Sequence, residues 1–174
     1  LLGGQQSGHI DAVGFEMYMK LLEQAVRELK GEEVEDEVRA TVNLGIDIRI
    51  SEAYVPDMAQ RLVAYRKIAS ARSAVEIDEA LTELRDRYGP PPESVLNLVE
   101  YGRIRVMADA IGVESIERQG RAAVLKFRSG GTSRVPDPQR ILGLISRRPD
   151  VTLVPPAGLK LHLDSGTGDR GPGT

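Results

Sequence analysis

The sequence predicts an α+β fold, in which a layer of helices packs on a small, mainly antiparallel sheet. Three observations support this: two amphipathic segments over residues 54–92, period-two alternation around residue 46, and several short strand-like segments after residue 112. Helical and strand patterns occur in blocks and do not alternate strictly, which favours α+β over α/β. The net charge is −3 and there is no cysteine, which excludes disulfides and cysteine-ligated metals.

Residues 1–38 are expected to precede the compact domain. Residues 1–8 contain three glycines and no periodicity, so they are predicted to be a loop. A helix is predicted over residues 11–30. Its apolar residues at helical spacing are Phe15, Met19, Leu22, Val26 and Leu29. The acidic run at residues 32–37 repels itself and predicts an extended linker. This places the start of the main domain at residue 39.

The main domain, residues 39–163, is expected to begin with a strand and a pair of helices. Apolar and polar residues alternate over residues 42–50, which is typical of a half-buried strand. Asp57 is placed to cap the first helix, and Ser73 with Glu76 has the capping-box spacing for the second. Gly89 and the prolines behind it should end that second helix.

A central helix and a block of strands are predicted for the rest of the domain. The helix is expected over residues 92–111, where apolar residues occur on more than one side. A hairpin turn is predicted at residues 118–121, and a short helix after residue 136. Strands are expected at residues 113–117, 122–127, 151–154 and 159–163. Residues 164–174 have four glycines and no large apolar residue, which predicts a disordered tail.

The sequence contains no recognisable catalytic centre of its own. A phosphate-binding loop needs a Gly-Lys-Ser/Thr step, and none is present. His9 and His162 are the only histidines, and neither has other ligands at metal-binding spacing, so no metal or cofactor site is predicted. There is no nucleophile elbow, and scattered carboxylates make a small hydrolase a minor alternative. Asp86-Arg87 could form a specific contact, although a local salt bridge is the simpler interpretation.

Charge is distributed unevenly along the chain. Residues 1–56 hold 5 Lys/Arg and 11 Asp/Glu, whereas residues 100–163 hold 11 and 6. Such asymmetry can dock one part of a protein on another, although ordinary solvated faces explain it more simply. It also supports an alternative function, a nucleic-acid-binding module built on the basic region from Arg103 to Arg148. The expected contacts of that module are Arg118, Arg121, Lys126 and Arg128.

Two stretches of the sequence resemble the transcription-repair coupling factor family. Leu-Gly-Gly-Gln-Gln-Ser-Gly at residues 2–8, followed by Val-Gly-Phe-Glu-Met-Tyr-Met at 13–19, resembles the end of that family's translocation motif. RecG-type helicases share its L-G-x-x-Q-[ST]-G core. Tyr-Val-Pro-Asp at 54–57, the stretch at 61–69 and Leu-Arg-Asp-Arg-Tyr-Gly-Pro-Pro-Pro at 84–92 resemble the family's C-terminal domain. Together the motifs cover roughly residues 1–128.

The resemblance implies a large bacterial ATP-dependent translocase of double-stranded DNA as the parent protein. Such a protein displaces stalled RNA polymerase and recruits the excision-repair protein UvrA. ATP and magnesium would bind in the parent's motor domains, and no cofactor is expected in this fragment. The residues that match the translocation motif are Gly3, Gln6, Ser7 and Gly8. Gln6 is the expected hydrogen-bonding relay between the nucleotide state and the grip on DNA.

The resemblance also implies that residues 39–163 are a regulatory (TRCF) domain without catalysis of its own. In the family this domain packs on the N-terminal UvrA-homology region of the same polypeptide and represses the enzyme. The charged candidates for that interface are Arg61, Arg66, Arg85 and Arg87. A cytoplasmic location without membrane contact is expected.

Overall fold

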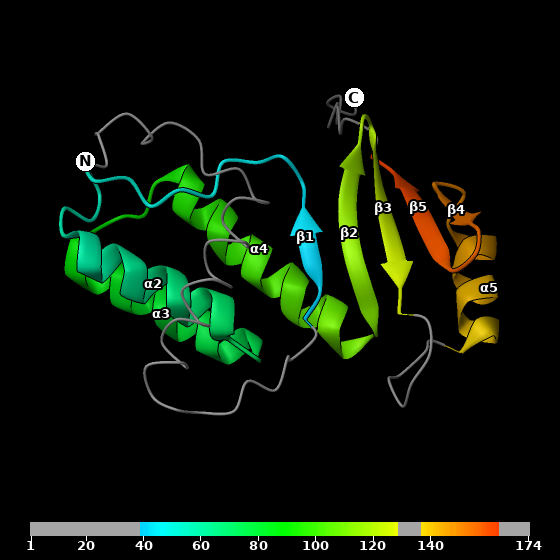
Figure 1. Cartoon of the computed structure of the whole chain (residues 1–174), viewed down its shortest axis with the longest axis horizontal. Helices are drawn as coiled ribbons and strands as arrows, with labels where there is room; N and C mark the ends of the chain where they lie inside the picture. The colour runs from blue at the N-terminus through cyan, green and yellow to red at the C-terminus, as the bar shows by residue number, and fades with distance from the viewer. Residues whose placement is uncertain (1–38, 129–136, 164–174) are drawn as a thin grey trace, which may run out of the picture.

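The helices and strands lie side by side, as a helical layer at one end and a mixed sheet at the other (Figure 1). The computed structural model describes residues 39–128 and 137–163. The helices are α2 (Met58–Ser70), α3 (Ala74–Tyr88), α4 (Glu93–Ala110) and α5 (Pro138–Arg147). The strands are β1 (Thr41–Asn43), β2 (Val113–Gln119), β3 (Ala122–Phe127), β4 (Val151–Val154) and β5 (Gly158–His162). The predicted α+β class is confirmed.

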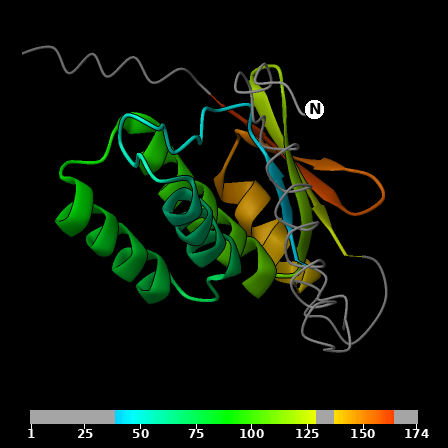
Figure 2. The same ribbon diagram turned by 60° about the vertical axis from the view of Figure 1, so that its left-hand side comes forward.

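The sheet has five strands in the order β1-β2-β3-β5-β4. β1 pairs with β2 in parallel, and the other three pairings are antiparallel, so the prediction of a mainly antiparallel sheet is confirmed. Gly120, with φ 60°, forms the tight turn between β2 and β3, a conformation that glycine adopts without a steric penalty. Figure 2 shows α4 and α5 on the same side of the sheet.

Helix α4 is the centre of the core, as its apolar residues on several sides predicted. It packs against α2, α3, β1 and β2, and its fully buried side chains include Leu98 and Tyr101. At Gly102 the helices approach so closely that an added Cβ would lie 2.9 Å from Cγ2 of Ile68 and 3.3 Å from Cδ1 of Ile77. Only glycine fits there without displacing its neighbours.

The predicted ends of the helix pair are present, with one difference. The Asp57 carboxylate accepts a hydrogen bond from the backbone N–H of Gln60 at 2.8 Å. Ser73 caps α3 at the N–H of Glu76, as predicted, but the Glu76 carboxylate reaches back to the N–H of Arg72 and not to that of Ser73. Gly89, with φ 83°, ends α3 and donates its N–H to the carbonyl of Arg85.

The prediction of a nine-residue strand at residues 42–50 is wrong. β1 has only three residues, because Gly45, with φ 64°, turns the chain away from the sheet. The following backbone is bound by side chains: Ser94 Oγ donates to Arg49 O at 2.6 Å, and Tyr65 Oη accepts from Ile50 N at 2.6 Å. The alternation correctly indicated which side chains are buried. After Asn43, however, the segment pairs with no strand in the described part of the chain.

Arg39 anchors the chain where the described fold begins. Its Nε lies 2.9 Å from a carboxylate oxygen of Asp109, at the end of α4. Its two terminal nitrogens donate to the carbonyls of Ala69 at 3.0 Å and Ala71 at 2.8 Å, at the end of α2. Arg128, which follows β3, contacts the same carboxylate of Asp109 at 3.3 Å. One acidic side chain therefore joins the chain entry, the helical layer and the sheet.

Several predictions lie outside the described residues. These are the loop and translocation-motif residues at 1–8, the helix at 11–30, the acidic linker at 32–37 and the disordered tail at 164–174.

Candidate docking surface on the α2–α3 hairpin

Helices α2 and α3 pack side by side at the end of the molecule far from β4 (Figure 1). One apolar face of each helix points inward, where Ile68 of α2 and Ile77 and Leu84 of α3 are buried. The chain reverses between them within Ala71–Ser73, where the caps of the two helices meet. Their outer faces therefore present charged residues from two elements on one rigid unit.

Two tyrosines fix the end of this hairpin. The Tyr54 hydroxyl is hydrogen-bonded to the carbonyl oxygens of Leu84 at 3.2 Å and Gly89 at 3.0 Å. Burial raises the pKa of Tyr54, so the hydroxyl stays protonated as a donor. Its ring meets that of Tyr88 edge-on at 6.0 Å, and the Arg87 guanidinium lies 5.5 Å from the centre of the Tyr88 ring.

A polar network crosses the outer seam between the two helices. Lys67 of α2 forms an ion pair with Glu83 of α3. Arg87 Nη1 lies 3.2 Å from Glu83 Oε1 and 3.3 Å from Gln60 Oε1. The hydrogen bond from Lys67 is the main cause that holds the pKa of Glu83 below its ordinary value, with a smaller contribution from Arg87. Glu83 is therefore ionised at neutral pH and ties both helices together.

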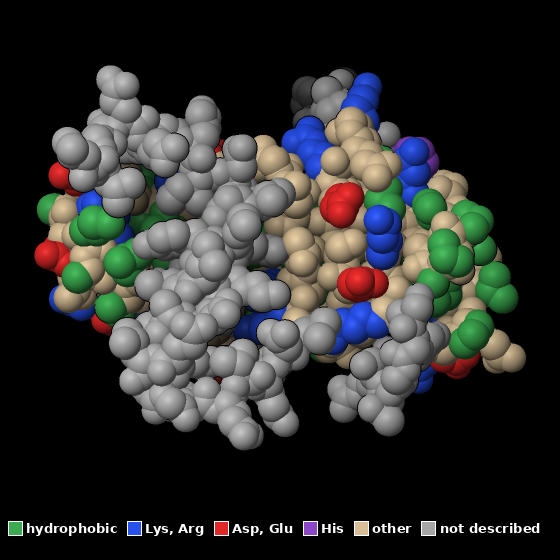
Figure 3. Space-filling model, in the orientation of Figure 1, with side chains coloured by type: hydrophobic (Ala, Val, Ile, Leu, Met, Phe, Trp, Pro, Cys, Tyr) green, Lys and Arg blue, Asp and Glu red, His purple; other side chains and the backbone are tan. Residues whose placement is uncertain are grey.

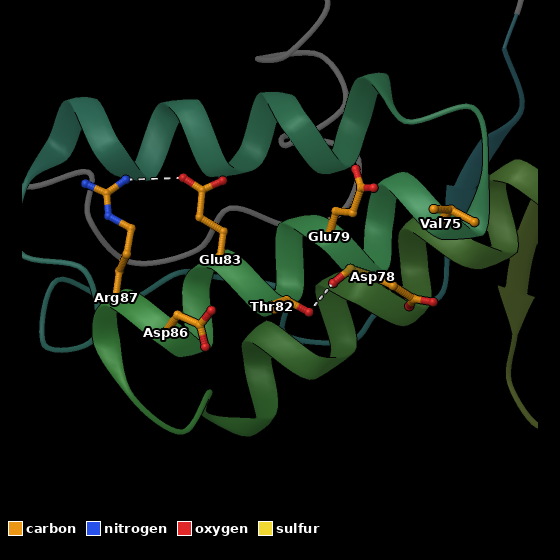
Figure 4. Close-up of a pocket in the computed structure, with 7 residues that line it drawn as sticks. All are labelled: Val75, Asp78, Glu79, Thr82, Glu83, Asp86 and Arg87. Atoms are coloured by element: carbon orange, nitrogen blue, oxygen red, sulfur yellow. Dashed lines mark hydrogen bonds and ion pairs between the residues drawn. The ribbon is translucent and has the colours of Figure 1, made fainter.

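A shallow hollow of about 530 Å³ lies along the outer side of α3 (Figure 4). It is lined by Val75, Asp78, Glu79, Thr82, Glu83, Asp86 and Arg87. Arg103 of α4 pairs with Asp78 at 2.5 Å, whereas the carboxylates of Glu79 and Asp86 form no ion pair with the described part of the chain. Val75 is 64% exposed. The hollow is thus acidic, with the Arg87 guanidinium at one end and the apolar side chain of Val75 at the other.

The four arginines predicted for an interface have different surroundings. Arg61 donates to the carbonyls of Val55 at 2.8 Å and Pro56 at 2.9 Å, so it holds the loop before α2. Arg66 on α2 and Arg85 on α3 are exposed, and Arg87 belongs to the network described above. The local salt bridge expected for Asp86-Arg87 exists, but it joins Arg87 to Glu83.

The sequence interpretation did not single out the carboxylates of this hollow. The signal was available, because acids and a threonine at positions 78, 79, 82, 83 and 86 have the three- and four-residue spacing of one helix face. An acidic helix face is common on solvated surfaces, however, and only the tertiary structure places it beside Lys67.

The cations of the nucleic-acid alternative do not form one patch. Arg118 pairs in register with Ala123, so it lies on the opposite face of the sheet from Lys126. Arg128 is partly buried and contacts Asp109, and Arg121 lies in the β2–β3 turn. Over the sheet face in Figure 3, Lys and Arg are interspersed with Asp and Glu.

Other site predictions can be placed only in part. Gly3, Gln6, Ser7 and Gly8 of the translocation motif lie outside the described residues. In residues 39–128 and 137–163, no group of three or more His, Cys, Asp or Glu side chains could hold a metal ion. No helix of the same ranges is long and apolar enough to cross a membrane.

The arrangement of elements is that of a known class of domain. A crystal structure of the C-terminal domain of a transcription-repair coupling factor superposes with a TM-score of 0.64 at 24% identity, covering 73% of this chain and 81% of that one. The sequence profile of the TRCF domain matches residues 44–137. The chain belongs to the transcription-repair coupling factor family and contains its TRCF domain.

Curated relatives agree with this assignment. The transcription-repair-coupling factor of Escherichia coli is 32% identical over 154 residues, which is 86% of this chain and 13% of that protein. Those of Buchnera aphidicola and Myxococcus xanthus are 35% identical over 137 residues and 32% identical over 156 residues. These alignments cover 76% and 90% of this chain, but only 17% and 13% of the relatives. The chain thus spans a small part of the length of its relatives.

Proposed function

We propose that this chain is the C-terminal regulatory part of an ATP-dependent translocase of double-stranded DNA that couples transcription to nucleotide excision repair. The parent displaces stalled RNA polymerase and recruits UvrA in the cytoplasm. The fragment itself does not catalyse; it docks on the N-terminal UvrA-homology region of its own polypeptide and keeps the enzyme repressed. ATP and magnesium act in the motor domains, and Gly3, Gln6, Ser7 and Gly8 belong to the trailing edge of that motor.

The observation that carries this proposal is the outer face of the α2–α3 hairpin. It is held rigidly by Tyr54 and by the Lys67–Glu83 ion pair. Next to Arg87 it carries the carboxylates of Glu79 and Asp86, which have no ion-pair partner among residues 39–128 and 137–163. A rigid surface with a fixed pattern of acidic and basic side chains favours a partner with the complementary pattern and rejects others. We therefore assign the intramolecular contact to this face, with Arg66, Arg85 and Arg87 at its rim and Arg61 as the residue that fixes its edge.

A polar contact of this kind suits a restraint that must be released. A difference in affinity of ~3 kcal/mol between the closed and open states keeps about 99% of the molecules closed. A few charged hydrogen bonds supply such an amount, and binding of another partner can overcome it. Exposed ion pairs are also weakened by salt, so the restraint should loosen as ionic strength rises.

The test is a calorimetric titration of the 174-residue chain with the N-terminal UvrA-homology region of the same parent protein. We expect saturable binding that weakens by about tenfold with Asp86→Lys or Arg85→Glu, which corresponds to about 1.4 kcal/mol. Lys126→Glu, on the sheet, is the matched charge reversal and should leave the affinity unchanged. Circular dichroism would establish that each variant is folded.

Two results would contradict the proposal. One is the absence of binding at low salt; the other is equal loss of affinity for Lys126→Glu and the hairpin variants. Hydrolysis of ATP by the chain at a motor-like rate would refute its non-catalytic role. A shift of duplex DNA that is lost with the four basic substitutions at positions 118, 121, 126 and 128 would favour the nucleic-acid-binding alternative.

A further inference from the structure

Helix α5 is the least buried of the described helices. None of its residues is buried, although its sequence is strongly amphipathic. Ile141 and Ile145 pack partly against the core beside β4, but Leu142 is 58% exposed and Leu144 is 44% exposed. The neighbouring strand adds Leu153, which is 57% exposed. The apolar face of α5 is therefore wider than the part that the sheet covers.

Gly143 lies in the middle of α5 for no reason that the described fold provides. A Cβ at this position would meet no atom within 4 Å, and glycine weakens a helix interior relative to alanine. Gly143 lies at a shallow surface hollow of about 470 Å³. The hollow is lined by Asp137, Gln139, Arg140, Gly143, Leu144 and Arg147. A glycine flanked by longer side chains allows another backbone to approach the helix closely.

The charges around this hollow are not neutralised locally. Arg140 and Arg147 are seven residues apart, so they lie on the same side of α5 about 10 Å from each other. Neither forms an ion pair within the described residues. The nearby acids are already engaged: Asp137 caps α5 at the N–H of Gln139, and Asp150 holds Arg148 through contacts of 2.8 and 2.6 Å.

We propose that the outer face of α5 is a second docking surface, which binds an acidic amphipathic helix of a protein partner. Apolar side chains of that helix would cover Leu144, its backbone would approach Gly143, and its carboxylates would pair with Arg140 and Arg147. This surface goes beyond the proposed restraint. It lies at the other end of the molecule from α2 and α3 (Figure 1), so both surfaces can be occupied at once.

Charge and exposure together select this kind of partner. A nucleic acid would neutralise the arginines through its phosphates but would leave Leu144 in water. A second copy of the chain, related by a two-fold axis, would bring the arginines of one α5 close to those of the other, which is repulsive. An acidic and apolar helix satisfies both the exposed Leu144 and the arginines.

The experiment titrates the 174-residue chain with a fluorescent synthetic helix of about 18 residues, in which glutamates flank a leucine stripe. The same peptide with lysines in place of the glutamates, and a short duplex DNA, are the comparison probes. We expect saturable binding of the acidic peptide only. The affinity should fall by about tenfold or more with Arg140→Glu/Arg147→Glu.

Gly143→Leu separates docking from folding. The position is open, so the variant should keep its circular dichroism spectrum while filling the hollow and weakening the peptide at least as much as the arginine reversals. Lys126→Glu, an exposed cation on the other face of the sheet, should bind as the wild type does. Equal binding of the lysine peptide, preferential binding of duplex DNA, dimerisation that depends on Arg140, or undiminished binding by Gly143→Leu would each overturn the proposal.

Discussion

The helices at the two ends of the molecule differ in how far their side chains are buried and paired. On the α2–α3 hairpin, the apolar seam between the two helices is buried, although Val75 is exposed, and several of the outer charges are paired, as in the Lys67–Glu83 contact. On α5, no residue is buried, and Arg140 and Arg147 are unpaired within the described chain. The first surface is stable by itself and selects a partner by charge. The second still has apolar area to bury, so a partner would stabilise it.

The largest expected difference is in the stability lost when a leucine is truncated in the central helix α4 or in the terminal helix α5. Leu98→Ala, at a fully buried position of α4, should lower the free energy of unfolding by about 2–5 kcal/mol, because it removes buried area and leaves a cavity. Leu142→Ala, at an exposed position of α5, should change it by about 0.5 kcal/mol or less. Urea unfolding followed by circular dichroism measures both. Similar losses would show that α5 is as well packed as α4.

The next largest effect concerns the joint between the two ends. Asp109→Ala removes the carboxylate that binds Arg39, Arg128 and the N–H of Ala40. We expect a loss of about 2–4 kcal/mol, because partly buried donors lose their partner. Asp150→Ala is the control, since its ion pair with Arg148 is on the surface, and its unfolding midpoint should hardly move. Equal midpoints for the two variants would mean that Asp109 is not a structural joint.

Two glycines in helices provide a matched test of packing. Gly102→Ala should destabilise the protein by about 1–3 kcal/mol, because its Cβ would meet Ile68 at 2.9 Å. Gly143→Ala should stabilise it by about 0.5–1 kcal/mol, because the site is open and alanine favours the helix. Thermal unfolding of both variants decides the sign. Destabilisation by Gly143→Ala would reveal a contact that α5 makes inside the chain.

The smallest effect is expected from the exposed network of the hairpin. Glu83→Gln should cost about 0.2–1 kcal/mol, since surface ion pairs contribute little. Because the pKa of Glu83 in the folded state is lowered from 4.5, its contribution is complete above that value and is lost as the pH falls through the folded-state pKa. The difference from wild type should therefore be present at pH 7 and vanish in acid. A difference that persists in acid would point to a cause other than the ion pair.

The parts of the fold that depend on local chemistry could be predicted from the sequence. Asp57, Ser73 and Gly89 act on backbone groups within four residues of themselves, so their identity was enough to place the helix ends. The strand at residues 42–50 failed because a strand also needs a distant partner. The alternation of apolar and polar residues indicated which side chains are buried. The backbone of this segment, however, is hydrogen-bonded by the side chains of Ser94 and Tyr65, which lie on helices later in the chain.

The candidate site was less accessible to sequence reasoning. Arg87 was identified, but its partner Glu83, four residues earlier on the same helix, was not, although that spacing is visible in the sequence. Lys67 could not be assigned to Glu83, because the packing of α2 on α3 determines which of their charges meet. Arg61 shows a contact that the sequence did not indicate: its Nη1 donates to the carbonyls of Val55 and Pro56. The sequence did not indicate a surface at Arg140, Gly143 and Arg147, because tertiary packing determines which face of a helix stays exposed.

The anchor at Arg39 has a mechanical consequence. Its guanidinium donates hydrogen bonds to the carbonyls of Ala69 and Ala71, at the bend between the two helices of the hairpin. By contrast, β1 is joined to β2 by only three residue pairs. Tension on the polypeptide ahead of Arg39 would thus be delivered to that bend before it reached the strands. A pull on the upstream chain would therefore load the hairpin bend and, through Asp109, the end of α4 together.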